Sequence, residues 1–173
     1  REHSALAGSL DLETVNAAAV FDNSVFGATS PVAGGRSRFE VTPTVGTISF
    51  TGALADYRRY VMPARFYTVA GRVMHYGRYG SGAEDARLMP LFIGYPELLR
   101  GYDIGSFSSS ECTTTFTGSC AEFDRLLGSR MLVANLELRF PLLRPFGAGS
   151  GMYGPLPIEV AVFTDGGAAW NAG

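Results

Sequence analysis

The chain has 173 residues with 46% hydrophobic and 12% aromatic content, and its formal net charge is −2. This length suffices for one domain with a buried core, and the near-neutral charge lacks the basic footprint of a nucleic-acid partner. Every long apolar stretch is interrupted by Gly, Pro or a charged residue before the roughly 20 residues that a spanning helix needs, which argues against a helical membrane protein. Because Gly, Phe and Tyr are abundant and no segment sustains a helical repeat, the sequence predicts an all-β fold.

Seven strands are predicted from alternating apolar and polar residues. They are Ala5 to Leu12, Val15 to Asp22, Ser37 to Val45, Ser49 to Val61, Arg65 to Tyr76, Met131 to Phe140 and Leu156 to Trp170. The alternation is clearest in Met131 to Phe140, where Leu132, Leu136 and Leu138 share one face and Asn135, Glu137 and Arg139 share the other.

The length of these segments favours an antiparallel transmembrane β-barrel. Most have about ten residues or more, as a tilted spanning strand requires, whereas strands of soluble sheets usually have about five or six. Several also end in aromatic residues, as interfacial girdles do; examples are Tyr57, Tyr76, Phe140 and Trp170. A soluble β-sandwich or a lipocalin-like barrel is the alternative, because alternation does not say which face points inward.

Three short connections and one long one are predicted. Breaker residues place tight reversals at Met62 to Ala64 and at Ser30 to Gly35, and Leu142 to Pro155 forms a third turn. Residues 77–128 form a far longer connection, and loops above about 12 to 15 residues are usually functional or disordered. Since outer-membrane barrels alternate short periplasmic turns with longer external loops, 77–128 is predicted to be external.

Two cysteines lie within this long loop. An even pair in an exported chain predicts a disulfide between Cys112 and Cys120. The alternative is a two-thiolate metal site, but it lacks the further ligands that zinc needs, and His3 and His75 do not supply them. We therefore expect no metal.

Signatures of enzyme active sites are missing from the sequence. It has no G-x-S-x-G elbow, no HExxH and no P-loop, and the glycine-rich Gly77 to Gly82 lacks the lysine of a phosphate cradle. His75 lies within a predicted strand and is more readily a structural residue than a base. We expect neither catalysis nor a cofactor.

Four groups of residues, in order along the chain, resemble the barrel of the BamA/TamA outer-membrane assembly superfamily, also called bacterial surface antigens. They are Asp22-Asn23 with the Ser30-Pro31 turn and Gly35, then Arg100-Gly101-Tyr102, then Asn135 to Pro141, and finally Phe163 to Gly167 with Trp170. The resemblance spans nearly the whole chain.

This resemblance implies a specific contact within the barrel. In the family a long external loop folds into the lumen, where the arginine of a V/I-R-G-F/Y motif contacts acidic residues on the next two strands. Here the arginine is Arg100, followed by Gly101 and Tyr102, and the carboxylates are Glu137 and Asp165. Leu99 stands where the family often has Val or Ile. An arginine suits this role because its planar fork can bind a carboxylate through two hydrogen bonds.

The resemblance also implies a partial barrel, a location and a role. The family barrel has sixteen strands, and the seven predicted here correspond to its seventh to thirteenth; a short standalone barrel of about eight strands is the alternative. We expect an outer-membrane β-barrel segment over residues 1–173, in the bacterial outer membrane, with lipids and possible β-barrel clients or periplasmic assembly proteins as partners. Its expected role is the insertion or export of proteins or lipids. The alternatives are a passive pore or anchor barrel and, more weakly, a soluble all-β binding module.

Overall fold

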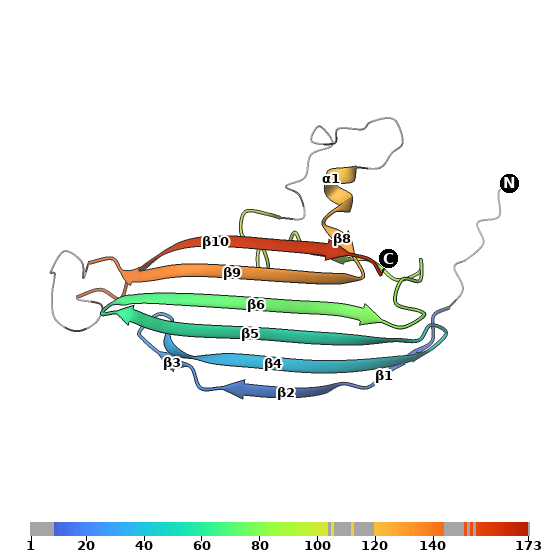
Figure 1. Cartoon of the computed structure of the whole chain (residues 1–173), viewed down its shortest axis with the longest axis horizontal. Coiled ribbons are helices and arrows are strands. Elements are labelled where there is room, and N and C mark those ends of the chain that lie inside the picture. The colour runs from blue at the N-terminus through green and yellow to red at the C-terminus, as the bar shows by residue number, and fades with distance from the viewer. Residues whose placement is uncertain are drawn as a thin grey trace.

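The computed structural model describes residues 9–103, 105, 112, 120–143, 151, 153 and 155–172. Its main feature is one antiparallel sheet of long strands that lie side by side (Figure 1). The strands of this sheet are β1 (Leu12–Thr14), β2 (Ala17–Asp22), β3 (Val25–Phe26), β4 (Pro31–Gly46), β5 (Phe50–Ala64), β6 (Tyr67–Tyr79), β9 (Arg130–Pro141) and β10 (Glu159–Trp170). The predicted all-β antiparallel fold is therefore confirmed.

The sheet has fewer strand positions than the seven predicted. Strands β4, β5, β6, β9 and β10 follow one another, while β1, β2 and β3 all pair with β4 and share the position beside it. Of the predicted strand Ala5 to Leu12, residues 5–8 lie outside the described residues, and only Leu12 is in a strand. In the part of the chain that the structure describes, β10 pairs with β9 alone, so the sheet is open at both edges.

Pro43 explains why β1 and β2 are separate strands although they continue one line along β4. The register Thr14↔Thr44 and Ala17↔Val41 is unbroken, so the chain does not reverse between β1 and β2. Pro43 lies opposite the gap and has no N–H to donate, although its carbonyl accepts a hydrogen bond from the Val15 N–H at 3.1 Å. The hydrogen-bond ladder between β4 and the β1–β2 line is therefore interrupted by a proline on β4.

The predicted reversals at Ser30 to Gly35 and Met62 to Ala64 are both misplaced. Strand β4 already begins at Pro31, so the predicted turn at Ser30 to Gly35 lies almost entirely within this strand. Proline is tolerated as the first residue of a strand because no ladder hydrogen bond is lost there. At the other site β5 continues to Ala64, and the chain reverses at Arg65 and Phe66, where Phe66 has φ of 74°. Met62 and Pro63 form an irregularity in the register before that turn, which accommodates the proline.

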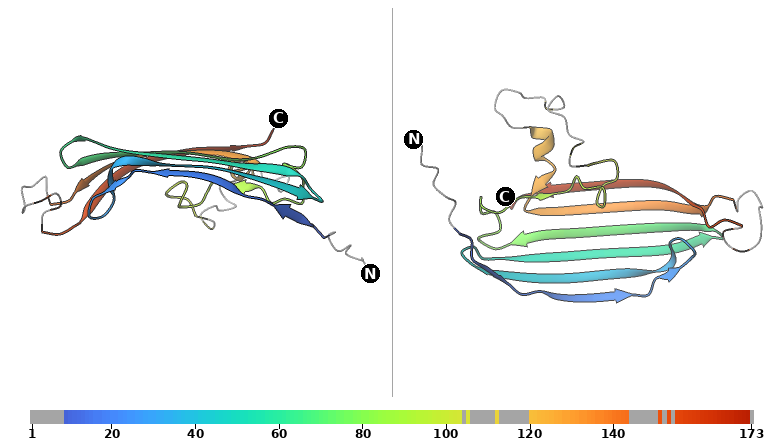
Figure 2. Two further views of the ribbon diagram at one scale, coloured as in Figure 1. Left: turned by 90° about the horizontal axis from the view of Figure 1, so that it is seen from below. Right: turned by 180° about the vertical axis from the view of Figure 1, so that it is seen from behind.

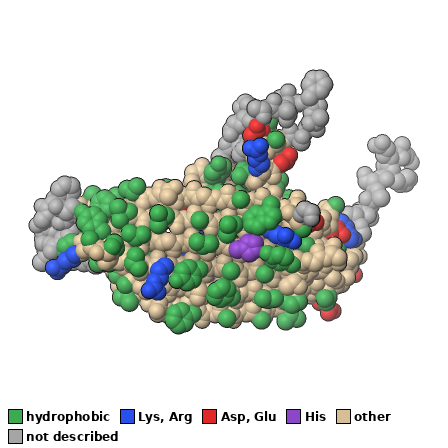
Figure 3. Space-filling view, viewed as in Figure 1, with side chains coloured by type: hydrophobic (Ala, Val, Ile, Leu, Met, Phe, Trp, Pro, Cys, Tyr) green, Lys and Arg blue, Asp and Glu red, His purple; other side chains and the backbone are tan. Residues whose placement is uncertain are grey.

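The two faces of the sheet differ in chemistry. The apolar face carries side chains such as Phe39, Val73, Leu136 and Val162, which are 53%, 51%, 51% and 62% exposed. Figure 3 shows hydrophobic side chains spread over this whole face, with few charged ones among them. The polar face carries most of the charged side chains of the strands, and their chemistry is described below. In the described part of the chain nothing covers the apolar face, so its side chains point away from the protein.

The long loop follows β6 and returns at β9. It contains the short paired strands β7 (Leu91–Phe92) and β8 (Leu127–Gly128) and the helix α1 (Ala121–Asp124). The part of the loop before α1 lies against one face of the sheet (Figure 2), whereas α1 extends past the β10 edge. Side chains from the loop and from the polar face form a buried cluster, Met74, Ile93, Leu99 and Val133. No helix among the described residues is long and apolar enough to cross a membrane.

Candidate functional site: the loop anchor

A tight turn in the loop presents Arg100 to the sheet. The N–H groups of Leu98 and Leu99 both donate to the carbonyl of Tyr95 at 2.9 Å, which closes one helical turn before the arginine. Gly101 then has φ of 96°, a left-handed conformation that favours glycine. Leu99 is 6% exposed and belongs to the buried cluster, so apolar packing fixes the residue next to the arginine.

Arg100 binds Asp165 with both arms of its guanidinium. Nε donates to Oδ2 at 2.7 Å and Nη2 donates to Oδ1 at 2.6 Å, while the backbone N–H of Arg100 donates to Oδ2 at 3.0 Å. Nη1 donates to Glu137. The guanidinium carbon also lies 3.7 Å from the centre of the Phe163 ring. These hydrogen bonds, those to Asp165 first, raise the pKa of Arg100, so the arginine remains charged.

The register between β9 and β10 brings the two carboxylates together. Asp165 lies opposite Asn135, and Phe163 lies opposite Glu137, so the four side chains occupy two adjacent rows on one face. Strand geometry places residues two apart on the same side, which is why the guanidinium reaches both rows at once. The structure therefore joins Arg100 to Glu137 and Asp165, the arginine and the two carboxylates among the residues that the resemblance singled out.

Two further polar side chains bind the loop backbone. Arg72 on β6 donates from Nη1 to the carbonyl of Glu97 at 3.1 Å, and Asn135 on β9 donates from Nδ2 to the carbonyl of Leu98 at 2.9 Å. With Asp165 on β10 accepting from the Arg100 N–H, three neighbouring strands each hold one residue of the loop. We call Arg72, Asn135, Glu137, Asp165 and Arg100 the loop anchor.

Asp56 on β5 orients the side chain of Arg72 on β6. Its carboxylate accepts from Arg72 Nε at 3.1 Å and Nη2 at 3.0 Å, and from Arg58 Nη2 at 2.8 Å. The bidentate contact leaves Nη1 of Arg72 free to reach the loop. On the other side, Arg139 binds Glu137, so this carboxylate is shared by two arginines. The anchor is thus embedded in a network of ion pairs across β5, β6, β9 and β10.

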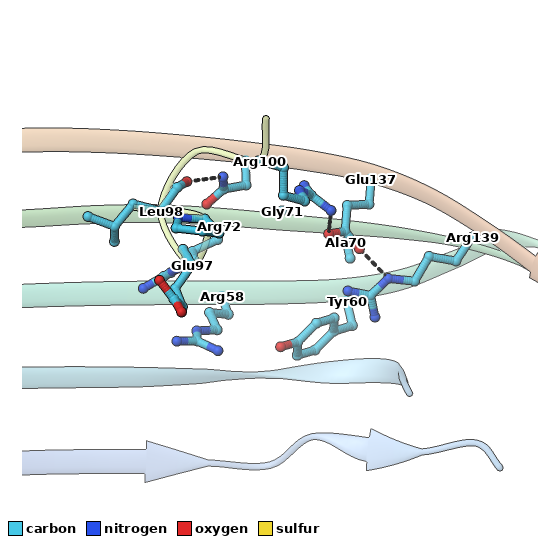
Figure 4. Close-up of a pocket in the computed structure, with 12 residues that line it drawn as sticks. Arg58, Tyr60, Ala70, Gly71, Arg72, Glu97, Leu98, Arg100, Glu137 and Arg139 are labelled. Carbon is cyan, nitrogen blue, oxygen red and sulfur yellow. Dashed lines mark hydrogen bonds and ion pairs between the residues drawn. The ribbon is translucent and has the colours of Figure 1, made fainter. Parts of the chain in front are cut away.

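A cavity of about 220 Å³ lies between the loop and the strands. Its wall includes Arg58, Arg72, Glu97 and Arg139, and Figure 4 shows these side chains around the space beneath the loop. The same view shows Arg100 and Arg139 both bound to Glu137. Ion pairs within the wall satisfy the arginines, so the arrangement is one that holds a loop in place.

The sequence did not predict the roles of Arg72, Asn135, Asp56 and Phe163. Each lies on the polar face of a predicted strand, which was a usable signal. Their convergence depends on the register Asp56↔Met74, Arg72↔Asn135 and Asn135↔Asp165, however, and a single sequence does not give the pairing of distant strands. Tyr102, predicted as the aromatic of the motif, is 40% exposed and lies outside the buried cluster.

Cys112 and Cys120 form a disulfide, with their Cα atoms 5.0 Å apart. His75 lies on the apolar face near the loop end of β6, where its ring contacts the Met131 carbonyl, the Tyr79 hydroxyl and Trp170. Among the residues that the structure describes, no group of three or more His, Cys, Asp or Glu side chains could hold a metal ion.

Comparison with known protein families matches residues 9–173 to the Omp85 superfamily domain. The chain belongs to the Omp85 superfamily. The resemblance to the BamA/TamA type of barrel is thereby confirmed, since this is the superfamily of those proteins. Omp85 domains are β-barrels of bacterial outer membranes with insertion or translocation functions. No curated protein matches the chain closely enough to be counted as a relative.

Proposed function

We propose that this chain forms part of the wall of an outer-membrane barrel that aids the insertion or export of other proteins or of lipids. The apolar face lies against lipid, the polar face lines the lumen, and the loop anchor holds the external loop inside the barrel. The role is non-covalent and needs no cofactor. Its partners are outer-membrane lipids and β-barrel clients or periplasmic assembly proteins.

The observation that carries this proposal is the exposure of the apolar face. Large side chains from β2 to β10 point outward there, Phe21 at 63% and Leu136 at 51% among them, while the opposite face carries Asp56, Arg72 and Asp165. A soluble sandwich or lipocalin-like barrel has the reverse arrangement, with apolar side chains inside. In a transmembrane barrel, apolar side chains face lipid and polar ones face the lumen.

The loop anchor adds a mechanical role to this wall. Because β6, β9 and β10 each bind a different loop residue, the loop ties three neighbouring strands together on the lumen side. Packing of Leu99 and Ile93 against Met74 and Val133 adds apolar burial to the same contact. We infer that this part of the wall stays rigid, so that any opening of the barrel for a client occurs at other strands.

Two experiments test the proposal in sequence. Heat-modifiable migration on gels, together with dependence on detergent, is expected of a membrane barrel; migration that does not change on heating would refute the membrane placement. Depletion of the protein from cells should then lower the amounts of other outer-membrane barrels. Unchanged amounts would assign the chain to a passive pore or anchor barrel, the alternative role for the same fold.

A further inference from the structure

The apolar face carries a charged side chain midway along its strands. Arg59 on β5 lies between Gly35 on β4 and Gly71 on β6, and its side chain is exposed. Among the described residues, its guanidinium makes no hydrogen bond, ion pair or ring contact. A cation on this face therefore has no partner within the described part of the protein.

Other arginines of the sheet do have partners. Arg58 and Arg72 bind Asp56, and Arg139 binds Glu137, all on the polar face. Arg130 is on the apolar face as well, but it lies at the loop end of β9 with its guanidinium carbon 4.7 Å from the centre of the Tyr79 ring. Arg59 thus stands out by both its position and its free donors, which two oxygens of one oxyanion could accept as a pair.

An apolar groove of about 360 Å³ adjoins Arg59. Its lining includes Tyr57, Gly71, Val73 and Leu136. The groove is open at Gly71 because a Cβ atom added there would meet nothing within 4 Å. A hollow with apolar walls and a cation at its margin matches a molecule that has a hydrocarbon chain and an anionic group.

The depth of Arg59 is compatible with a lipid headgroup. Its neighbour on β6, Gly71, is four residues from Tyr67, which is about 13 Å along the strand. Because the strands are tilted, this places Arg59 about 10 Å deeper in the membrane than the level of Tyr67. The Tyr67 and Phe140 rings, 5.8 Å apart, mark the turn end of this wall as aromatic girdles do. A long arginine side chain can extend its charge from this depth towards the interface.

We propose that Arg59 binds the phosphate of an anionic phospholipid in the leaflet at the turn end of the barrel, with an acyl chain of the same lipid in the groove. This rests on the proposed function, since it requires the apolar face to contact lipid. Charge complementarity selects the occupant: the guanidinium offers paired donors to a phosphate, and the mostly apolar lining of the groove suits an acyl chain.

Reconstitution of the full chain into nanodiscs made of equal parts of phosphatidylcholine and phosphatidylglycerol tests this site. Native mass spectrometry then counts the lipids of each kind that stay bound to the released protein. We expect a preference of about fivefold for phosphatidylglycerol, the factor expected of one basic residue at an anionic surface. Arg59→Gln should abolish this preference, whereas Arg59→Lys should keep most of it.

Arg125→Gln is the matched control, because it removes the same charge from an exposed position outside the sheet and should leave the preference unchanged. Gly71→Leu keeps Arg59 and fills the groove, so it should lower the amount of bound phosphatidylglycerol. Equal preference in Arg59→Gln and the unaltered chain overturns the proposal, and so does an unchanged amount in Gly71→Leu. If the unaltered chain does not enter nanodiscs at all, the membrane function itself fails; if it enters without preference, only the lipid site fails.

Discussion

Replacing Arg100 by alanine should release the loop from the sheet. The change removes two hydrogen bonds to Asp165, one to Glu137 and the stacking on Phe163. The side chain of Asp165 is only 5% exposed, so its carboxylate would lose its cation while remaining shielded from water. Glu137 would keep Arg139 as a partner and should suffer less.

The expected magnitude follows from this burial. Removing one partner of a buried ion pair typically costs about 3 to 5 kcal/mol. Arg100 is itself 31% exposed, and Asp165 would keep the Asn135 amide and the backbone N–H of residue 100, so we expect the lower end, about 3 kcal/mol. Because about 1.4 kcal/mol is tenfold in an equilibrium, the population of detached loop should rise by about 100-fold.

Limited proteolysis of the membrane-embedded or detergent-bound protein measures that population, because cleavage within the loop requires its detachment. Arg100→Lys should give an intermediate rate, since it keeps the charge and loses the fork. The control is Arg87→Ala, which breaks a similar pair with Asp85 in the same loop, where the two side chains are 47% and 25% exposed; it should not change the rate of cleavage. Equal rates for Arg100→Ala and the unaltered protein would refute the anchor.

Three further changes test separate parts of the loop. Asn135→Leu deprives the Leu98 carbonyl and Asp165 of a donor and should weaken loop attachment by about 1 to 2 kcal/mol in the same assay, with a less than additive effect beside Arg100→Ala. Gly101→Ala should cost about 1 kcal/mol, measured by thermal unfolding, because φ of 96° strains an alanine although nothing lies within 4 Å of the new Cβ. Hydrogen bonds from Arg87 lower the pKa of Asp85 to about 2 from 3.8, so the contribution of this pair is complete above pH 3.8 and is lost as the pH falls through about 2; an NMR titration should show this midpoint, and Arg87→Gln should move it upward.

The alternation in the sequence was sufficient to predict β4, β5, β6, β9 and β10 and the chemistry of their two faces. Strand ends were less predictable, since proline and glycine signals overstated where strands stop. Pro31 and Gly34 lie within β4 and Pro63 lies within β5, where the sequence placed reversals, because β3 and β5 pair with the first segment and β6 pairs on either side of Pro63. Such effects come from adjacent strands and cannot be read from one segment.

The loop anchor likewise contains residues that could be predicted from the sequence and residues that could not. Arg100, Glu137 and Asp165 could be named because a family pattern joins them, whereas nothing in their spacing of tens of residues requires contact. Arg72 and Asn135 carried only the signal of a polar side chain in a strand. Their partners are backbone carbonyls of the loop, and any loop sequence has carbonyls, so these contacts could be found only from the structure.

The separation of β6 from β9 has a consequence for how the sheet assembles. Gly77 and Arg130 are paired across about fifty intervening residues, whereas the β5–β6 turn has only two. Closing the longer connection costs roughly 3 kcal/mol more chain entropy than closing the short one. We expect the meander β4–β5–β6 and the hairpin β9–β10 to form early as separate units, and their joining to be the slow step, which the anchored segment accelerates by shortening the free tether between them.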